Sequence, residues 1–233
     1  MRLEALRKEV LEANLALVHH GLVVDTFGNL SGIAREDGLV VIKPSGVPYD
    51  KMTPADMVVT ELDGHIVEGG LRPSSDLATH LVLYRAFPQI GAVAHTHSRH
   101  ASAWAQAGRE IPCFGTTHAD YFRGPVPVTA PLTAAEIESD YEANTGECIV
   151  RRFAALDPLE IPAVLVSGHA PFCWSSTPAA VARLAMLLEE IARLAWLTIS
   201  IDPGAGPLPT ALRDKHFLRK HGPSAYYGQP RRS

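Results

Sequence analysis

Cysteine is scarce in this sequence. Its 233 residues include three cysteines, Cys113, Cys148 and Cys173, which are widely spaced. An odd number at such spacing indicates neither a disulfide framework nor a CxxC zinc motif. We expect three free thiols in a reducing compartment, and we therefore predict a cytoplasmic protein.

A large excess of one charge and a long uninterrupted apolar run are also missing. The formal net charge is −4 at pH 7, which provides no electrostatic basis for binding nucleic acid or a membrane surface. The longest apolar stretch, residues 181–201, is interrupted by Arg183, Glu189, Glu190 and Arg193. This pattern indicates a buried amphipathic helix, so we expect no membrane span, no membrane partner and no nucleic-acid partner.

The length predicts a single domain over residues 1–233, because one core accommodates it and the sequence shows neither a second core nor an internal repeat. An Asp63-Gly64 turn indicates a hairpin, and strands alternate with helices only in part. The expected strands are 39–42, 57–60, 65–67, 126–129 and 162–166; the expected helices include 76–87, 99–107, 177–199, 210–220 and one opened by a capping box at Thr133 and Glu136. This pattern predicts an α/β fold of α+β-like character, with helices covering a mixed sheet.

Two histidines, His95 and His97, follow an apolar run at residues 90–94. In a strand, residues two apart project from the same face, so both imidazoles would point into one site. His169 follows a second apolar run at 163–166, and three imidazoles around an open position are typical of catalytic rather than structural zinc. Chance spacing or hydrogen-bonded core histidines are the alternative, but the three together favour a metal site.

Three loops rich in small residues lie at 26–31, 43–47 and 73–76. Serine hydroxyls, backbone N–H groups beside glycine and a helix N-terminus can cradle an anion, and Lys43 adds a positive charge. Each loop alone is consistent with ordinary turn chemistry. Together they predict a phosphate site.

Two carboxylates could take part in chemistry. Asp76 could interact with the dipole of the helix that it opens, ligate a metal or act as an acid or base, and its spacing alone favours the first role. Asp120, in the polar loop 115–121, could be a general base or a solvated loop residue. His118 in the same loop is more consistent with a hydrogen-bonded structural histidine.

The C-terminal segment is basic. His216 and Arg219 are three residues apart and share a helix face, where they could bind an anion together or form a solvated surface. Tyr227, in the tail that follows, could pack on the surface or donate a proton.

These segments together resemble the class II aldolase/adducin-like family. The resemblance covers nearly the whole chain, and two C-terminal-half motifs are closest to its epimerase branch. The motifs are Thr26-Phe-Gly-Asn-Leu-Ser31, Lys43-Pro-Ser-Gly-Val47, Arg72-Pro-Ser-Ser-Asp76, His95-Thr-His-Ser-Arg-His100, Gly115-Thr-Thr-His-Ala-Asp-Tyr121, Lys215-His-Phe-Leu-Arg-Lys-His-Gly222 and Ala225-Tyr-Tyr-Gly-Gln229.

The resemblance implies a single class II aldolase-like domain, with a mostly antiparallel sheet covered on both faces. It also implies a C4 homotetramer with active sites between subunits, in which residues 210–233 complete the site of a neighbouring subunit. The implied activity is the metal-dependent 4-epimerisation of L-ribulose 5-phosphate to D-xylulose 5-phosphate, by cleavage and re-formation of the C3–C4 bond.

The resemblance also assigns roles to residues. Zn²⁺, with Mn²⁺ or Co²⁺ as alternatives, would be held by His95, His97 and His169, with Asp76 as a possible fourth ligand. The sugar phosphate would be bound by Ser45, Gly46, Ser74 and Ser75, with Asn29 and Lys43 close by. Asp120 would be one acid/base and Tyr227, from a neighbouring subunit, the other; the supporting positions would be Thr116, Glu142, His216 and Arg219.

Two local sequences depart from the family pattern, and rival functions remain. The family commonly has Thr-Pro where this chain has Leu77-Ala78, and His-Gly-Pro where it has His169-Ala170-Pro171.

A family aldolase acting on a substrate such as L-fuculose 1-phosphate is the nearest rival, followed by a non-enzymatic adducin-like binding module and a sugar-phosphate dehydratase. The pathway, arabinose or ascorbate breakdown, stays open.

Overall fold

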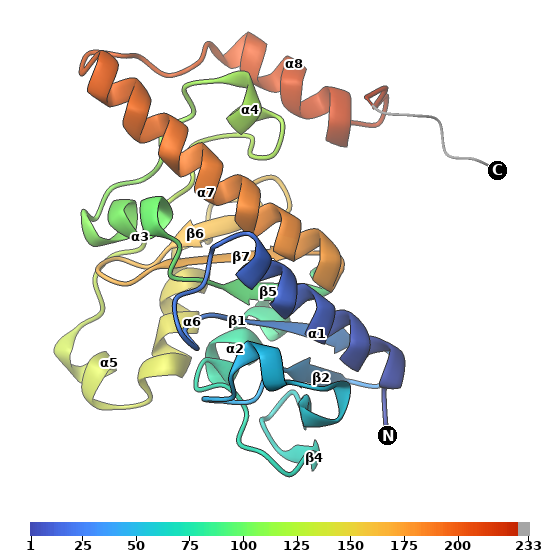
Figure 1. Ribbon diagram of the computed structural model, residues 1–233. Coiled ribbons are helices and arrows are strands. Elements are labelled where there is room, and N and C mark those ends of the chain that lie inside the picture. The colour runs from blue at the N-terminus through green and yellow to red at the C-terminus, as the bar shows by residue number, and fades with distance from the viewer. Residues whose placement is uncertain (228–233) are drawn as a thin grey trace.

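The fold is centred on one seven-stranded sheet. The computed structural model describes residues 1–227, and its strand order is β4-β3-β2-β1-β5-β7-β6 (Figure 1). All six neighbouring pairs are antiparallel. The strands are β1 (Asn29–Ala34), β2 (Leu39–Ile42), β3 (Val58–Glu61), β4 (Ile66–Glu68), β5 (Ala92–His95), β6 (Ala163–Leu165) and β7 (Pro171–Ser175). The prediction of a mostly antiparallel sheet is confirmed.

Helices cover both faces of this sheet. They are α1 (Glu4–His19), α2 (Leu77–Ala86), α3 (Arg99–Gln106), α4 (Thr116–Ala119), α5 (Ala134–Glu138), α6 (Tyr141–Arg152), α7 (Pro178–Ile201) and α8 (Thr210–His221), with 3₁₀ turns η1 (Tyr49–Lys51) and η2 (Pro54–Asp56). Neighbouring residues of β1 face opposite sides. Ser31 contacts α2, whereas a side chain at Gly32 would meet Leu6 of α1 and Pro178 of α7 within about 3.1 Å. The absence of a side chain at Gly32 therefore lets α1 and α7 lie close against the sheet.

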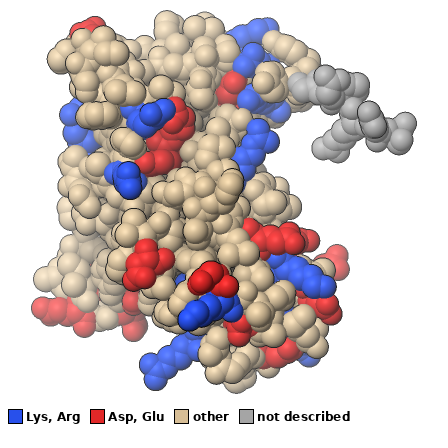
Figure 2. All heavy atoms as spheres, viewed as in Figure 1, with Lys and Arg blue, Asp and Glu red and all other residues tan. Residues whose placement is uncertain are grey.

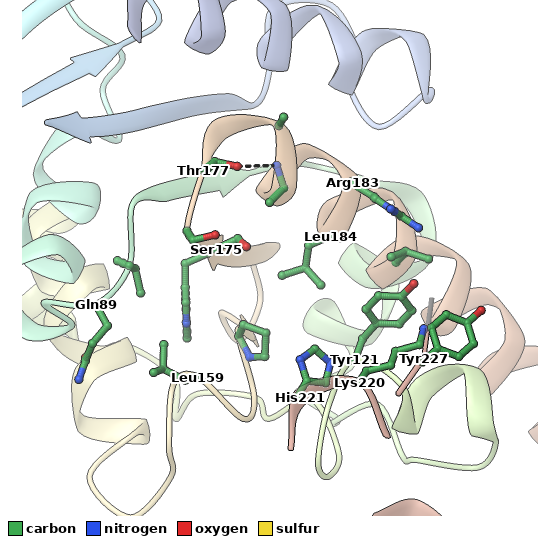
Figure 3. Close-up of a pocket in the computed structure, with 17 residues that line it drawn as sticks. Gln89, Tyr121, Leu159, Ser175, Thr177, Arg183, Leu184, Lys220, His221 and Tyr227 are labelled. Carbon is green, nitrogen blue, oxygen red and sulfur yellow. Dashed lines mark hydrogen bonds between the residues drawn. The ribbon is translucent and has the colours of Figure 1, made fainter. Parts of the chain in front are cut away.

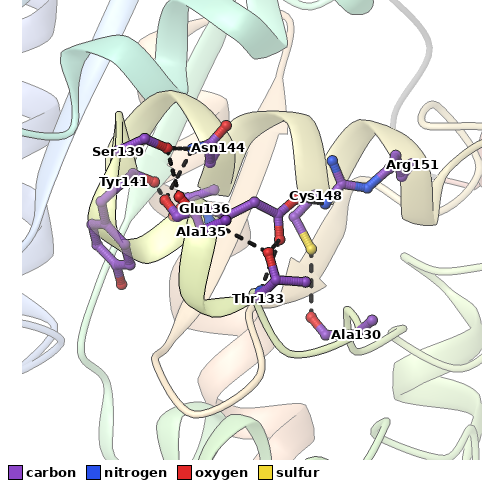
Figure 4. Close-up of polar contacts among 10 residues, drawn as sticks. Ala130, Thr133, Ala135, Glu136, Ser139, Tyr141, Asn144, Cys148 and Arg151 are labelled. Atoms are coloured by element: carbon purple, nitrogen blue, oxygen red, sulfur yellow. Dashed lines mark hydrogen bonds and ion pairs between the residues drawn. The ribbon is translucent and has the colours of Figure 1, made fainter.

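The α5–α6 corner is held by polar contacts (Figure 4). Thr133 and Glu136 form the predicted capping box at the start of α5. The Glu136 carboxylate also pairs with Arg151 of α6 at 2.6 Å, and Asn144 donates to the Glu136 carbonyl at 2.9 Å. This bracing fixes the start of α6, which lies beside the site described below.

Three expectations about strands need correction. Residues 126–129 form only isolated bridges, Ile111 with Val126 and Val128 with Leu165, because Pro125 and Pro127 lack the N–H groups that a ladder requires. The segment 29–34, expected to begin in a loop, is the central strand β1. The strand β7 was not expected, because it is buried on both faces and shows no polar alternation.

The described part of the chain contains no helix that is long and apolar enough to cross a membrane. On the face seen in Figure 2, acidic and basic side chains are interspersed over the lower part, whereas basic side chains gather at the upper right, over α8. Cys113, Cys148 and Cys173 are buried free thiols.

Candidate active site

Three histidines converge at one end of the sheet. His95 is the last residue of β5, His97 follows it, and His169 lies in the turn between β6 and β7. Gly168 adopts a φ of +71°, which tightens this turn and lets it present His169. The ring centroids lie 4.8–5.0 Å apart, and one nitrogen from each ring falls within 4.8 Å of the others. The spacing prediction is therefore met: two strands bring the three imidazoles together.

These histidines are kept neutral by burial. Burial lowers the pKa of His95 to about 3, and it also lowers the pKa values of His97 and His169. The Nδ1–H of His95 donates to the carbonyl of Pro171 at 3.0 Å, which leaves its Nε2 with a free lone pair. Neutral imidazoles with one nitrogen fixed by a carbonyl are the form that binds a metal.

The donor set fits a divalent metal ion. Two nitrogens about 2.0–2.1 Å from one zinc lie roughly 3.3 Å apart, and the Nε2 atoms of His95 and His97 are 3.1 Å apart. The Nδ1 atom of His169 is buried without a hydrogen-bond partner among the described residues. Asp76 is outside the set of mutually close donor atoms, so a fourth ligand stays a prediction.

Asp76 nevertheless lies beside the cluster. It precedes α2, and the side-chain amide of Asn29 donates to its carboxylate at 2.6 Å. Asn29 is itself paired with His95 across β1 and β5. Burial favours a higher pKa for Asp76, but the nearby His95 and His80 and the Asn29 hydrogen bond outweigh it and lower the pKa. The carboxylate is therefore held ionised next to the histidines.

Two of the three loops predicted to form a phosphate site, 43–47 and 73–76, lie side by side. The amide of Ser45 donates to the carbonyl of Arg72, and the amide of Ser74 donates to the carbonyl of Lys43, both at 2.9 Å. Ser45, Gly46 and Ser75 are exposed, whereas Ser74 and Lys43 are buried. The Lys43 ammonium contacts the Pro44 carbonyl at 3.3 Å and the Tyr49 ring, and within residues 1–227 it forms no ion pair with a carboxylate. A buried cation without a carboxylate partner is a site for an anion.

A second group of predicted residues meets where α8 packs on α4. We call it the α4–α8 corner: Asp120, Tyr121, His216, Arg219, Lys220 and Tyr227. The Asp120 carboxylate accepts from Arg219 at 2.8 and 2.9 Å and from His216 at 3.0 Å, and Lys220 lies 3.3 Å away. Burial raises the pKa of Asp120, but the hydrogen bonds from Arg219, His216 and Lys220 outweigh burial and lower it. Of the two alternatives for His216 and Arg219, a shared anion or a solvated surface, the structure shows the first, and the anion is a carboxylate of the same chain.

Tyr227 belongs to the same corner. Its backbone N–H donates to the Arg219 carbonyl, and its ring lies 4.8 Å from the Arg219 guanidinium and 4.3 Å from the Lys220 ammonium. Tyr227 is 60% exposed. Figure 3 shows it with Tyr121 and Lys220 on one wall of a cleft of about 870 Å³, which the start of α7 also lines. None of the three clustered histidines lines this cleft.

The corner and the histidine cluster are separate within one chain. Figure 1 shows α4 and α8 at one end of the molecule, beyond α7 and away from the sheet. Among residues 1–227, no hydrogen bond or ion pair joins Asp120 or Tyr227 to the three histidines. Thr116 begins α4 on the corner side, whereas Glu142 lies in α6, where its carbonyl accepts from Thr79. Residues 228–233 of the predicted tail lie outside the described residues.

Four residues beside the histidines were not singled out from the sequence. Phe172 stacks on His95 at 4.2 Å, Phe27 lies 5.9 Å from His97, and Tyr141 lies 6.4 Å from His169. His80 is fully buried one helical turn after Asp76. The i to i+4 spacing of Asp76 and His80 was the available signal; the aromatic residues carry none.

A family model provides the decisive comparison. The Class II Aldolase and Adducin N-terminal domain matches residues 8–196. The chain belongs to this family. Two curated relatives, each named L-ribulose-5-phosphate 4-epimerase UlaF, come from Salmonella paratyphi A (strain ATCC 9150 / SARB42) and Salmonella typhi. Each is 51% identical over 227 residues, which cover 97% of this chain and 100% of the relative.

Solved structures agree on the class II aldolase fold. An L-fuculose 1-phosphate aldolase superposes with a TM-score of 0.76 at 24% identity, covering 91% of this chain and 94% of its own. The L-fuculose-1-phosphate aldolase of Thermus thermophilus gives 0.67 at 26% identity, covering 88% and 100%. The recognition of the family and the predicted fold are both confirmed.

Proposed function

We propose that this protein is a metal-dependent enzyme that interconverts L-ribulose 5-phosphate and D-xylulose 5-phosphate by inverting C4. The observations that carry the proposal are the cluster of three neutral histidines and a buried lysine, Lys43, that pairs with no carboxylate among residues 1–227. The near-full-length similarity to two L-ribulose-5-phosphate 4-epimerases supports the same substrate.

The phosphate end of the substrate would bind at the paired loops. Ser45, Ser74 and Ser75 would offer hydroxyl donors, Gly46 and Ser75 would offer backbone N–H donors, and the Lys43 ammonium would neutralise the anion. Asn29 would stand between this cradle and the histidines, because its side chain already contacts Asp76. The cradle would keep a phosphorylated fragment in place after a carbon–carbon bond breaks.

The ketose end would face the histidines. Zn²⁺ suits three imidazoles, and Mn²⁺ or Co²⁺ could replace it. When bound by His95, His97 and His169, such an ion would supply a Lewis acid for the negative charge that develops on the ketose oxygens. Asp76, held ionised by Asn29, would be the fourth ligand or would orient the site.

Proton transfer would come from the α4–α8 corner of a neighbouring subunit. Breaking the C3–C4 bond requires a base for the C4 hydroxyl, and re-addition to the other aldehyde face requires an acid on the opposite side. Asp120 supplies a carboxylate and Tyr227 a phenol, and Arg219 contacts both. Because both lie apart from the histidines of their own chain, we propose that one subunit delivers them together to the next, within a C4 homotetramer.

The supporting residues would act on these two groups. His216 and Arg219 would hold the Asp120 carboxylate, and Thr116 would accompany them at the start of α4. Glu142 would approach the substrate from α6. The cytoplasmic location, the metabolic pathway and the lack of nucleic-acid and membrane partners stay predictions.

A product assay tests this function. Purified zinc-loaded protein is incubated with L-ribulose 5-phosphate, and D-xylulose 5-phosphate, dihydroxyacetone and glycolaldehyde phosphate are each measured. We expect xylulose phosphate without accumulated fragments. Accumulated fragments would show an aldolase instead, and a protein that binds no metal and turns over no substrate would favour the binding-module alternative.

A further inference from the structure

His80 has a buried nitrogen without a partner. Its side chain is fully buried in α2, its Nδ1 lies 2.7 Å from the Ser31 hydroxyl, and its Nε2 has no hydrogen-bond partner among the described residues. Buried polar atoms are nearly always satisfied, because an unmade hydrogen bond costs the full desolvation of the group. The unpaired nitrogen therefore calls for a partner that appears when the site is in its working state.

The hydrogen-bond chain behind His80 fixes which nitrogen carries the proton. The Tyr84 hydroxyl is buried and lies 2.8 Å from the Ser31 hydroxyl. If Tyr84 donates to Ser31 and Ser31 donates to Nδ1 of His80, every proton of the chain is used. The reverse order would leave the Tyr84 proton without an acceptor. Because Nδ1 then accepts a hydrogen bond and carries no hydrogen itself, the hydrogen of the imidazole is on Nε2.

The surroundings of His80 supply acceptors on the metal side. Asp76, which caps α2, is followed at intervals of four by His80 and Tyr84 within the helix. The three share a face that packs on Asn29 and Ser31 of β1. The Asn29 amide occupies one oxygen of the Asp76 carboxylate. The His80 ring lies edge-on to Phe172, 6.1 Å away, and Phe172 stacks on His95. The unpaired donor thus lies in the wall of the histidine cluster, next to an ionised carboxylate.

We propose that His80 is a positioning residue whose Nε2–H donates to the Asp76 carboxylate and orients it toward the metal held by the three histidines. The Tyr84–Ser31 pair sets the His80 tautomer and so acts through it. This role rests on the proposed metal-dependent function. It adds to that function a buried chain of hydrogen bonds, from Tyr84 and Ser31 through His80, that holds the Asp76 carboxylate.

Cobalt binding tests the proposal without substrate. The visible spectrum and the Co²⁺ dissociation constant are measured for wild type, His80→Asn, His80→Gln, Asp76→Ala and the double variant His80→Asn with Asp76→Ala. Gln can place an amide N–H near the position of Nε2, whereas Asn can keep only the contact to Ser31. We expect His80→Asn to weaken Co²⁺ binding about 10- to 100-fold and to change the spectrum, and His80→Gln to restore most of both.

The double variant separates positioning from general damage. If His80 acts through Asp76, adding His80→Asn to Asp76→Ala changes Co²⁺ affinity by less than about twofold. Fully additive losses, or a wild-type spectrum and affinity for His80→Asn, would overturn the proposal. A second double variant, His80→Asn with Asn29→Ala, gives a further check. If the loss caused by His80→Asn disappears in Asn29→Ala but not in Asp76→Ala, the acceptor is the side-chain Oδ1 of Asn29, and the proposal is overturned.

Two further measurements keep the outcomes distinct. Ser31→Ala is a smaller change that frees the His80 tautomer, so it should shift the cobalt spectrum in the same direction even if His80→Asn does not fold. In turnover, His80→Asn should lower kcat more than it raises KM, because His80 is not placed to touch the phosphate. If the effects of His80→Asn and Asp76→Ala on Co²⁺ affinity are non-additive but the protein does not epimerise the substrate, only the proposed function is contradicted. If the protein epimerises the substrate but the two effects are additive, only the role of His80 is contradicted.

Discussion

Lys43 is the residue whose surroundings bear most directly on substrate binding. Its side chain is buried, burial lowers its pKa, and no carboxylate within residues 1–227 pairs with it. A buried cation is costly to the fold unless an anion compensates it. The lysine is therefore explained by a ligand that brings the missing negative charge.

Replacing Lys43 with Met should separate binding from stability. We expect KM for L-ribulose 5-phosphate to rise about 10- to 100-fold, because a charged hydrogen bond contributes roughly 1.5–3 kcal/mol. The Tm of the ligand-free protein should stay the same or rise, because the unpaired charge is gone. Lys51→Met, at an exposed lysine in η1, is the matched control. An unchanged KM together with a lower Tm would show that Lys43 is a structural residue.

Single residues also show where sequence reasoning succeeds and where it stops. His95 and His97 could be placed because an apolar run and a two-residue spacing define a strand and its face. Asn29 and Ser31 were read as loop residues, because small polar side chains favour turns. In the fold they belong to β1, where the Asn29 amide donates to Asp76 and the Ser31 hydroxyl contacts His80 and Tyr84 of α2. Only the folded chain brings those partners together.

At the scale of elements, α8 was predicted over 210–220 and lies at Thr210–His221, but its packing partner could not be predicted from the sequence. The sequence shows the basic face of this helix. It does not show that the Asp120 carboxylate pairs with that face, because Asp120 is about a hundred residues earlier in the chain. The short helix α4 was read as a polar loop, since four residues carry little periodic signal. The contact between α4 and α8 gathers both candidate acid/base residues into one corner.

This arrangement predicts that two inactive variants can restore each other. His97→Asn should lose the metal half of the site, and Asp120→Asn should lose the proton-transfer half while keeping normal metal content. In mixed tetramers, an Asp120→Asn subunit offers an intact histidine cluster to the intact corner of a His97→Asn subunit. Random equal mixing around a closed ring should regain about a quarter of wild-type turnover.

The control for this experiment mixes two variants of the same half. His95→Asn with His97→Asn should recover nothing, because no subunit then carries an intact cluster. If His97→Asn with Asp120→Asn also recovers nothing, although mass spectrometry shows mixed tetramers, Asp120 acts within its own subunit and the corner has another role.

At the scale of the whole molecule, buried histidines link stability to pH. Burial lowers the pKa values of His80 and His118 to about 4 and that of His95 to about 3, from an ordinary 6.5. The unfolded chain therefore takes up protons below pH 6.5 that the folded chain refuses until pH 3–4. Since protonation then favours the unfolded chain, the contribution of these histidines to the free energy of unfolding is fully present above pH 6.5. It is lost as the pH falls through this window.

Denaturant unfolding of metal-free protein between pH 7.5 and pH 4 checks this dependence. Stability should fall across the window, with each histidine adding up to about 1.4 kcal/mol per pH unit. His118 donates to the Gly124 carbonyl through Nε2 at 2.7 Å, so His118→Gln can keep that contact while removing the titrating ring. The slope should become shallower in this variant; an identical slope would show that His118 is not buried in its neutral form.

The whole-molecule resemblance and the local geometry agree on one chemistry, in which a carbon–carbon bond breaks and re-forms. The sequence could predict the single mixed domain, because its apolar runs and turns define most strands. It could not predict that the histidines and the corner lie apart in one chain, because that separation arises from α7, which packs on the sheet, and from α8, which packs on α4 away from the sheet.

The most direct measurement follows L-ribulose 5-phosphate labelled with deuterium at C4, incubated with the zinc-loaded protein and observed by NMR. Cleavage of the C3–C4 bond leaves the C4–H bond intact, so we predict D-xylulose 5-phosphate that keeps its deuterium at C4. Product that has exchanged deuterium for solvent hydrogen would show proton abstraction at C4, and no xylulose phosphate from metal-loaded protein would show that the substrate is a different one; either result would contradict the account.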